Sequence, residues 1–518
     1  MEKSKYAIEL IDIEKRFGPV YANNKVCLKV ETGSIHGVIG ENGAGKSTLM
    51  SILYGFYKAD SGEIKVFGNK LQFNDSHQAI RSGIGMVHQH FMLVDNFTVI
   101  ENVILGSEGG AILHEGIKSA REKLTILGED YGLKVDLDAT IDSLSVGSQQ
   151  RVEILKALYK GARVLILDEP TGVLTPQETQ DLFRIFTALK EEGVTIILIT
   201  HKLREIISIT DNVSVMRSGK MVAHRQTSQT NQEDLAELMV GRKVLLKVDK
   251  EEKSKGKELL KVNSLSVRDS NNIYRLKDIS FEIHAGEILG IAGVSGNGQS
   301  TLLKVLSGIT PVSSGEIEIL GHTINKDNLI FPDKIREFGL AHVPEDRQRM
   351  GLISNFSASE TSILGYHNNK KINNKLILNN SIVRENCESL MSEFDVRPRN
   401  PDLKSDNFSG GNQQKLIVAR EFENDPKVLL IGQPTRGVDI GAIEFIHKRI
   451  IALRDSGKAI LLVSVELDEI MSISDRIVVL CDGQVSGRID SKDADEKTLG
   501  MMMANVFNKE ENLAEISN

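Results

Sequence analysis

Short runs of apolar residues alternate along the chain with longer stretches in which apolar residues recur at helical spacing. The runs VLILDEP (164–170) and VTIILIT (194–200) have the length and β-branched content of buried strands. In QQRVEILKALYKG, the residues Val152, Leu155 and Leu158 fall on one helical face. Strands that alternate with helices predict an α/β protein with a mainly parallel sheet.

The chain contains two copies of one pattern. IHGVIGENGAGKSTLMSILYGFYKADSGEI, which begins at Ile35, recurs as ILGIAGVSGNGQSTLLKVLSGITPVSSGEI, which begins at Ile288. Further along, LSVGSQQR recurs as FSGGNQQK, and DNVSVMRSGK recurs as DRIVVLCDGQ. The offset between the copies is 253 residues at the first motif and 264 at the other two, so the second copy has 11 extra residues in its middle. Insertions collect at surfaces, so the middle of each copy is predicted to be peripheral and its last third to be core.

The boundary between the copies lies near VDKEEKSKGKE, a short charged segment without a hydrophobic period. Such a segment is typical of a solvated linker. We therefore predict a first domain over 6–243, a linker over 244–257, a second domain over 258–506 and a C-terminal tail over 507–518.

Composition agrees with two soluble domains. The chain has 518 residues, of which 40% are hydrophobic and 26% charged, and chains of this length usually form more than one domain. The formal net charge of −8 argues against nucleic-acid binding as the main function. The three scattered cysteines are expected to be buried thiols, not a zinc site. No apolar run approaches the ~20 residues of a membrane span, and the first residues lack the apolar core of a signal peptide.

The stretch GENGAGKS matches the phosphate-binding pattern GxxxxGK[ST] between a predicted strand and a predicted helix. Its glycines allow backbone N–H groups to surround a phosphate, and the helix N-terminus adds positive potential. Lys46 would neutralise the β- and γ-phosphates of a nucleotide, and Ser47 would hold Mg²⁺. The predicted nucleotide-binding residues of this loop are Gly40, Glu41, Asn42, Gly43, Ala44, Gly45, Lys46, Ser47 and Thr48.

Two carboxylates end the strand VLILDEP. Asp168 would reach the magnesium ion, and Glu169 would orient or deprotonate the attacking water. Gln89, in MVHQH, lies where a side chain could contact the metal and sense the γ-phosphate, and His201, in LITHKL, could contact the γ-phosphate. Taken alone, a Gln or His at a strand end is usually an ordinary polar loop residue, so these two depend on the rest of the pattern.

The stretches LSVGSQQR and FSGGNQQK each place a Ser-x-Gly turn at the start of a predicted helix. Exposed N–H groups and a hydroxyl make such a turn an anion site. The phosphate loop of the same domain is already complete, so the natural use of this turn is on the nucleotide of another domain.

Taken in order and spacing, the loop, glutamine, signature turn, carboxylate pair and histidine resemble the ATP-binding cassette superfamily over nearly the whole chain. The resemblance implies two tandem P-loop cassettes, each with a mainly parallel core sheet, an antiparallel β part and a helical signature subdomain. It also implies that two cassettes pair head to tail and enclose ATP. Phe17, 29 residues before Lys46, stands where the family places an adenine-stacking aromatic; core packing is the alternative.

In the resemblance, site one is complete and site two is degenerate. Site one combines the first half's motifs with Ser409, Gly410 and Gly411 of the second signature, and its catalytic groups are Lys46, Gln89, Glu169 and His201. Site two would be closed by Ser145 and Gly147. In the second half the groups that bind phosphate, metal and water are replaced at five positions: Gln299, Glu345, Gly432, Gln433 and Val465. Ser300 keeps the hydroxyl of the loop, and Ser270 stands where an aromatic residue would stack on adenine. Several losses together predict that site two does not hydrolyse ATP.

Two fused cassettes without a membrane span resemble the ATP-binding subunits of bacterial sugar and nucleoside importers. VPEDR and SGGNQQK are shared by that group, and GNGQS and GQPTRGVDIGAIEFIHKRI resemble its nucleoside branch. The resemblance implies ATP and Mg²⁺ as cofactors and a peripheral position on the cytoplasmic face of the cell membrane. It also implies an integral membrane permease and an extracytoplasmic solute-binding protein as partners. A monosaccharide importer remains the alternative, and a soluble twin-cassette ATPase acting on ribosomes or DNA is a more distant one.

Overall fold

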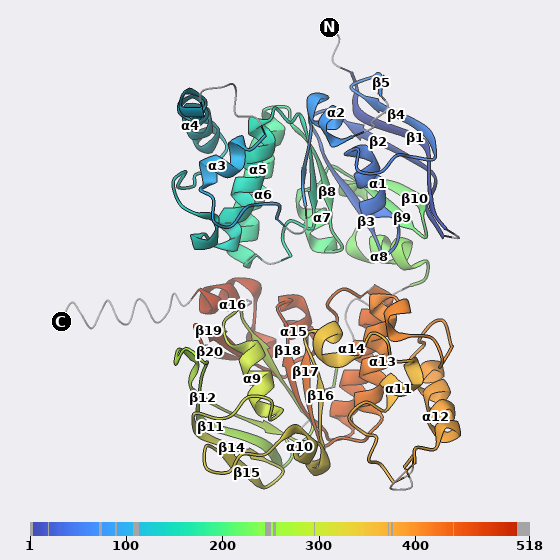
Figure 1. The fold of residues 1–518 in the computed structure, drawn as a ribbon, viewed down its shortest axis with the longest axis vertical. Coiled ribbons are helices and arrows are strands. Elements are labelled where there is room, and N and C mark those ends of the chain that lie inside the picture. The colour runs from blue at the N-terminus through green and yellow to red at the C-terminus, as the bar shows by residue number, and fades with distance from the viewer. Residues whose placement is uncertain are drawn as a thin grey trace, which may run out of the picture. The chain divides into compact units, whose positions relative to one another are not determined.

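The computed structural model describes residues 4–18, 20–71, 75–88, 91–106, 113–172, 174–243, 250–251, 255–294, 296–370, 372–373, 377–438 and 440–504. It divides into two compact units, residues 1–244 and 245–518. Each unit holds a four-stranded and a six-stranded sheet with the same strand order (Figure 1). The expected α/β fold of two cassettes is confirmed, and the repeat in the sequence is a repeat in structure.

The first unit is built around a six-stranded sheet in the order β10-β9-β3-β8-β7-β6. Its strands are β10 (Lys220–Gln226), β9 (Asn212–Arg217), β3 (Ile35–Gly40), β8 (Thr195–Ile199), β7 (Val164–Asp168) and β6 (Ile84–Val87). All neighbours are parallel except β9 and β10. Every residue of β3 and β8 is buried, as expected for strands that are covered on both faces.

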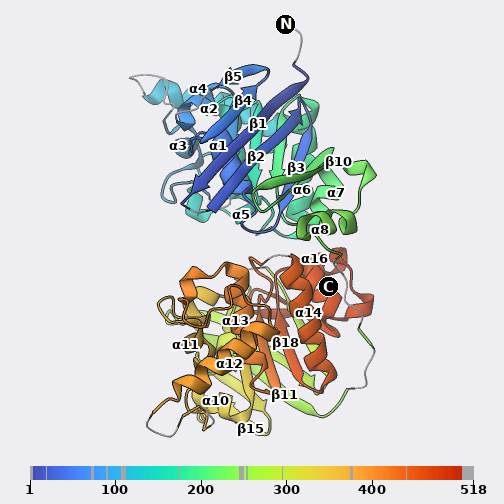
Figure 2. The same ribbon diagram turned by 90° about the vertical axis from the view of Figure 1, so that its right-hand side faces the viewer.

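A four-stranded antiparallel sheet and a group of helices complete the first unit on opposite sides of the core sheet (Figures 1 and 2). The sheet has the order β2 (Val20–Glu31), β1 (Tyr6–Phe17), β4 (Ser61–Val66) and β5 (Asn69–Leu71). The helices of the opposite side are α3 (Val99–Ile104), α4 (Leu113–Asp130) and α5 (Val146–Tyr159). The remaining helices are α1 (Lys46–Leu53), α2 (Ser76–Arg81), α6 (Pro176–Glu191), α7 (Leu203–Ile209) and α8 (Gln232–Val240). Val152, Leu155 and Leu158 are all buried along α5.

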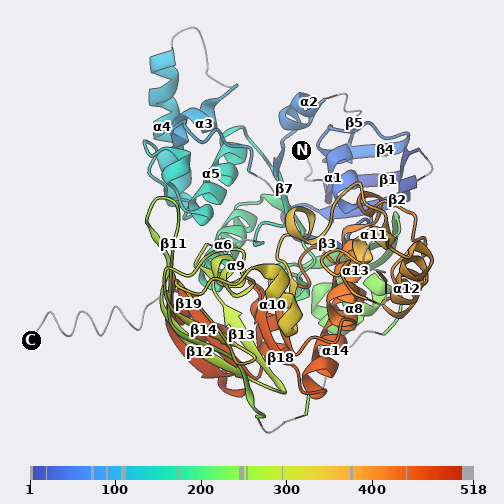
Figure 3. The same cartoon turned by 60° about the horizontal axis from the view of Figure 1, so that its bottom comes forward.

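The second unit repeats this arrangement, with its antiparallel sheet and its helical part on opposite sides (Figure 3). Its core sheet consists of β16 (Leu340–Val343), β17 (Val428–Gly432), β18 (Ala459–Val463), β13 (Glu287–Ala292), β19 (Arg476–Cys481) and β20 (Gln484–Asp490). Its antiparallel sheet consists of β12 (Tyr274–His284), β11 (Glu258–Arg268), β14 (Ser314–Ile319) and β15 (His322–Asn325). Its helices are α9 (Gln299–Leu306), α10 (Pro332–Phe338), α11 (Ala358–Ser362), α12 (Asn380–Glu393), α13 (Gly410–Phe422), α14 (Ile440–Asp455), α15 (Leu467–Ile473) and α16 (Glu496–Met503).

Strand β17 shows why these core strands read as continuous apolar runs. Leu429 and Ile431 pack into the cluster formed with α13 and α14. Val428 and Leu430 pack into the cluster formed with α9 and the antiparallel sheet. Successive side chains of a strand point to opposite faces, so a sheet with two covered faces needs an apolar residue at every position.

The structure also bears on the expectations for the cysteines, the linker and the tail. Of the three cysteines expected to be buried, only Cys387 is; Cys481 is partly buried and Cys27 is exposed, so the expectation is wrong for these two. Cys27 lies on β2, where the N–H of Asp12 donates to its Sγ at 3.3 Å. In the segment expected to be a linker, Lys250 pairs with Asp475 at 2.9 Å, and Arg454 donates to the Glu251 carbonyl at 2.7 Å. The expected tail lies outside the described residues. None of the described helices is both long and apolar enough to cross a membrane.

Candidate functional site

In the first unit, the phosphate loop closes on itself through Lys46. Its Nζ donates to the carbonyl of Gly40 at 2.7 Å and to that of Glu41 at 3.1 Å, and the side chain is buried. Burial lowers the pKa of Lys46, while Glu169 and Asp168 act in the opposite direction. Gly45 has a φ of 99°, and a β-carbon there would lie 2.1 Å from the Ala22 carbonyl oxygen, so only glycine fits. The loop therefore presents its backbone and one lysine to a ligand.

Asp168 ends β7, and the hydroxyl of Ser47 at the start of α1 acts to lower the pKa of its carboxyl. Burial, and then the neighbouring Glu169, raise the pKa of Asp168 to about 6. A bound cation would relieve this unfavourable ionisation, and carboxylate and hydroxyl oxygens suit Mg²⁺. Among the described residues no three His, Cys, Asp or Glu side chains gather to hold a metal. The pair fits an ion that takes its other ligands from water and phosphate.

Glu169 and His201 form a pair at the ends of two adjacent strands. Glu169 follows β7 with a φ of 50°, and its N–H donates to the carbonyl of Ile199 on β8 at 2.8 Å. Its Oε1 lies 2.9 Å from Nδ1 of His201. This hydrogen bond is the main reason that the pKa of Glu169 lies below its usual value. The carboxylate is therefore ionised and oriented, as a group that positions water must be.

The structure says less about two other predicted site residues, Phe17 and Gln89. Phe17 ends β1 with its side chain exposed, and its ring meets that of Tyr57 edge to face at 5.4 Å. Exposure argues against the core-packing alternative for Phe17. Gln89 lies outside the described residues.

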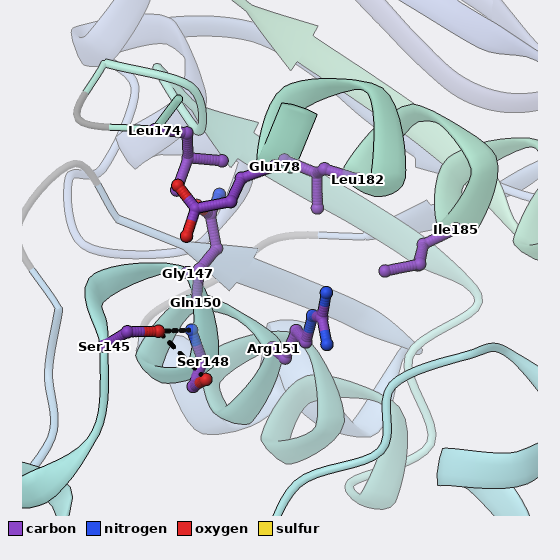
Figure 4. Close-up of a pocket in the computed structure, with 9 residues that line it drawn as sticks. All are labelled: Ser145, Gly147, Ser148, Gln150, Arg151, Leu174, Glu178, Leu182 and Ile185. Carbon is purple, nitrogen blue, oxygen red and sulfur yellow. Dashed lines mark hydrogen bonds between the residues drawn. The ribbon is translucent and has the colours of Figure 1, made fainter. Parts of the chain in front are cut away.

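The signature turns lie at the N-termini of α5 and α13. Ser145 caps α5, since its Oγ accepts from the N–H of Ser148 at 3.3 Å (Figure 4). Ser409 precedes α13 without such a bond, and its Oγ accepts instead from Nδ2 of Asn412 at 2.8 Å. Ser145 and Ser409 are exposed, whereas the glycines of the two turns, Gly147, Gly410 and Gly411, are partly buried.

In the second unit, Gln299 closes the loop where the first unit has Lys46. Its Nε2 donates to the carbonyl of Val294 at 3.1 Å, and the side chain is 4% exposed. Ser300 follows it and is exposed. The second unit therefore has no charge at the position of Lys46.

In the second unit, other side chains occupy the space where the first unit has its two carboxylates. A β-carbon on Gly432 would lie 2.6 Å from Cγ of Glu345. Gln433 is buried, and its φ of 49° is close to the 50° of Glu169. Its Oε1, however, accepts from the N–H of Val465 at 3.4 Å. The backbone amide of Val465 thus takes the place that His201 has beside Glu169. Neither Gly432 nor Gln433 has a side chain that could accept a proton from water.

A family model described as ABC transporter matches residues 23–172 and 276–436. The chain belongs to this family. Membership confirms the nucleotide-binding cassettes that the sequence motifs predicted.

Three curated relatives cover almost the whole chain. The nucleoside import ATP-binding protein NupA of Lactococcus lactis subsp. cremoris is 45% identical over 96% of this chain and 97% of its own length. The guanosine import ATP-binding protein NupO of Bacillus subtilis is 44% identical over 98% of both chains. The glucose import ATP-binding protein TsgD13 of Haloferax volcanii is 41% identical over 96% of this chain and 95% of its own. The resemblance to the nucleoside branch is confirmed.

A solved structure similar to this chain covers both cassettes. It is a complex of an archaeal ribosomal stalk protein with an archaeal ribosome recycling factor, with a TM-score of 0.63 over 95% of this chain and 92% of that chain. At 20% identity, this likeness shows the tandem fold alone.

Sequence reasoning missed the groups that surround the two signature turns. Glu178 lies beside Gly147, and Arg347 lies beside Gly410. In the sequence, VPEDR indicates only the family, and no spacing along the chain predicts that Arg347 lies next to Gly410, which is 63 positions away.

Proposed function

We propose that this chain is the ATP-hydrolysing subunit of an importer, and that it drives the uptake of nucleosides through a separate membrane permease. The observation that carries the proposal is the cluster of nucleotide-binding and catalytic groups at one edge of the first core sheet. Lys46, Ser47, Asp168, Glu169 and His201 come together there, whereas among the matching residues of the second unit only Ser300 keeps its group.

The reaction is ATP plus water to ADP plus phosphate. Glu169, held by His201, orients the water and takes its proton while the water oxygen bonds to the γ-phosphorus and the bond to the β–γ bridging oxygen breaks. Lys46 and the N–H groups of the loop neutralise the phosphate charge. Ser47 and Asp168, with Gln89, would hold Mg²⁺, which would neutralise charge on the phosphates.

Site one is completed in trans by Ser409, Gly410 and Gly411. Exposed Ser409 and partly buried glycines at the start of α13 suit an anion. The phosphate loop of the first unit is complete without the signature turn of its own unit. Phe17 stacks on the adenine from the edge of β1. Site two, closed by Ser145 and Gly147, does not hydrolyse ATP.

The solute is inferred from the two relatives named for nucleoside and guanosine import. A monosaccharide is the second candidate, because a relative of 41% identity is named for glucose import. The partners are integral permease subunits and, through them, an extracytoplasmic solute-binding protein. The chain then lies at the cytoplasmic face of the cell membrane. Its cassettes span 6–243 and 258–506.

The proposal is tested by reconstituting the chain with its permease and binding protein in proteoliposomes. Nucleosides, pentoses and hexoses are screened for stimulation of ATP hydrolysis and for uptake. We expect purine or pyrimidine nucleosides to stimulate both. Stimulation by a free sugar and not by its nucleoside would replace the nucleoside assignment with the monosaccharide one, and ATP hydrolysis without any coupled uptake would contradict the importer function.

A further inference from the structure

The second unit contains a buried ion cluster of two arginines and one glutamate. Glu421, on α13, is fully buried, and its carboxylate accepts from Nη1 of Arg336 at 2.9 Å and from Nε of Arg420 at 2.8 Å. The hydroxyl of Tyr366 donates to the same carboxylate at 2.7 Å, and the backbone N–H of His342 donates to it at 3.4 Å. Among the described residues, no second carboxylate pairs with either arginine. The cluster therefore has one positive charge in excess.

A cavity of about 110 Å³ lies beside this cluster, within the second unit. Its polar lining is formed by Arg336, His342 and Arg420. The rest of its lining is mostly apolar and includes Ile309, Leu340, Pro344 and Met350. A space of this size exceeds what one water molecule needs and can hold a small organic group.

Two polar groups at the cavity have no hydrogen-bond partner in the described part of the chain. The first is Nε2 of His342, which is buried. The second is Nη2 of Arg420, a side chain that is 2% exposed and uses its other nitrogens on Glu421 and on the carbonyls of Gly351 and Thr361. Burial lowers the pKa of His342 to about 4, so its imidazole is neutral near pH 7 and can donate through Nε2. Because a buried donor without an acceptor costs free energy, this pair of donors favours a ligand with an acceptor.

The first unit has no such cluster at the matching positions. Pairing of β6 with β7 and of β16 with β17 aligns the two units here. The matching residues are Ile80 for Arg336, Met86 for His342, Lys156 for Arg420 and Ala157 for Glu421. Replacing a buried ion cluster by apolar residues is often neutral or stabilising. Stability alone therefore does not explain why the second unit has charged residues where the first has mainly apolar ones.

We propose that this cavity of the second unit is a binding site for a carboxylate on a short aliphatic stem. The carboxylate supplies the negative charge that the cluster lacks, and its two oxygens accept from Nη2 of Arg420 and from Nε2 of His342. The stem lies against the apolar lining around Leu340. A phosphate fits less well, because the apolar lining offers no donors to its remaining oxygens.

The site is independent of ATP hydrolysis, so the inference goes beyond the proposed function. Arg420 also holds the carbonyl of Gly351, which ends the π-helix Arg347–Gly351, and that of Thr361 on α11. A bound carboxylate would therefore strengthen the contacts among β16, the π-helix and α11. Two sources share this chemistry: a free short-chain carboxylic acid, and the side chain of a glutamate in a protein partner.

The test is calorimetric titration of the full-length chain with propionate, with propionamide as the uncharged control. We expect saturable binding of propionate with a Kd on the order of 1 mM, and no binding of propionamide. His342→Met, which introduces the residue of the first unit, should weaken propionate binding about tenfold or more. Lys334→Gln removes a positive charge from the exposed side of α10, away from the lining, and should leave binding unchanged.

A second variant removes the cluster as a whole. Arg336→Ile, His342→Met, Arg420→Lys and Glu421→Ala, made together, give the second unit the residues of the first and leave no carboxylate buried without a partner. This variant should fold, as thermal unfolding would show, and should not bind propionate. Propionate binding by the fourfold variant would overturn the inference, and so would equal binding of propionamide or no binding of propionate to wild type.

Titration of the chain in complex with its permease separates the two sources. A free acid as the ligand predicts that propionate binds the complex and the free chain with similar affinity. A glutamate of the partner that fills the cavity predicts that propionate binds the free chain and not the complex. Only this comparison depends on the proposed function: if no complex with a permease forms, the proposed function fails, while titration of the free chain still decides the inference.

Discussion

A β-carbon added to Gly432 would lie only 2.6 Å from Cγ of Glu345 and 2.7 Å from Cδ1 of Leu303. The side chain of Glu345 thus fills the space that an aspartate at position 432 would need. The carboxylate missing from the second unit cannot be restored by one substitution, because its neighbours have closed over its place.

Gly432→Asp should therefore destabilise the second unit by about 1–3 kcal/mol through overpacking. Shortening the neighbour in Gly432→Asp/Glu345→Ala should restore most of that stability, since the two residues are in contact and their effects are not additive. Calorimetry on the full chain would follow the transition of each unit. Equal destabilisation in the single and double variants would show that Glu345 is not the obstacle.

Glu169→Gln should reduce ATP hydrolysis about 10²–10⁴-fold while leaving ATP binding intact, because the amide cannot accept a proton from water. The matched change Gln433→Glu should not add activity, since Gly432, Gln299 and Val465 still lack the required groups. Turnover and nucleotide binding are measured on the same preparations. Retention of turnover above a few per cent of wild type in Glu169→Gln would move hydrolysis away from site one.

Asp168→Asn should stabilise the nucleotide-free protein. The pKa of Asp168 is raised from its ordinary value of 3.8 to about 6, so the ionised carboxyl costs stability above pH 6 and the cost disappears as the pH falls toward 4. The substitution should raise stability at pH 7 by up to about 3 kcal/mol, and weaken Mg²⁺-dependent nucleotide binding. Melting temperatures at pH 7 and pH 5 check this. A variant less stable than wild type at pH 7 would contradict the assigned cause.

The sequence predicted the fold because its two halves repeat. Apolar runs such as the one ending at Asp168 mark strands, and the motifs between them fix the order of elements. Asp168, Glu169 and His201 could be placed together, since the carboxyl ends of parallel strands β7 and β8 meet at one edge. The pairing of Gly432 with Glu345 and of Gly410 with Arg347 could not, because each depends on how a loop folds back over residues far along the chain.

The first unit should lose stability in mild acid through His36. This side chain is 3% exposed on β3, and its Nε2 lies 2.7 Å from Oγ of Ser214, which also meets Nδ1 of His224 at 2.8 Å. Burial, and then His224, lower the pKa of His36 to about 3. The unfolded chain takes up a proton below pH 6.5 and the folded chain does not, so stability falls as the pH drops from 6.5 toward 3.

The expected loss from His36 is about 2 kcal/mol between pH 6.5 and pH 5. His36→Gln, which keeps a donor for Ser214 but cannot titrate, should flatten this dependence. The comparison is the transition temperature of the first unit in wild type and variant between pH 5 and pH 7. Parallel curves for the two proteins would assign the acid sensitivity to other groups.

Arginine substitutions in the two signatures should separate effects on stability from effects on catalysis. Ser145 caps α5 through the N–H of Ser148, whereas Ser409 makes no cap bond to the backbone of α13. Ser145→Arg should therefore cost about 1 kcal/mol of stability, and Ser409→Arg less. Turnover should follow the opposite order, because only Ser409→Arg forces a bulky side chain into the phosphate site that works. Thermal unfolding and ATP hydrolysis are measured on both variants; equal losses of turnover would mean that site two also contributes to closure and would refute the pairing of the second signature with the first loop.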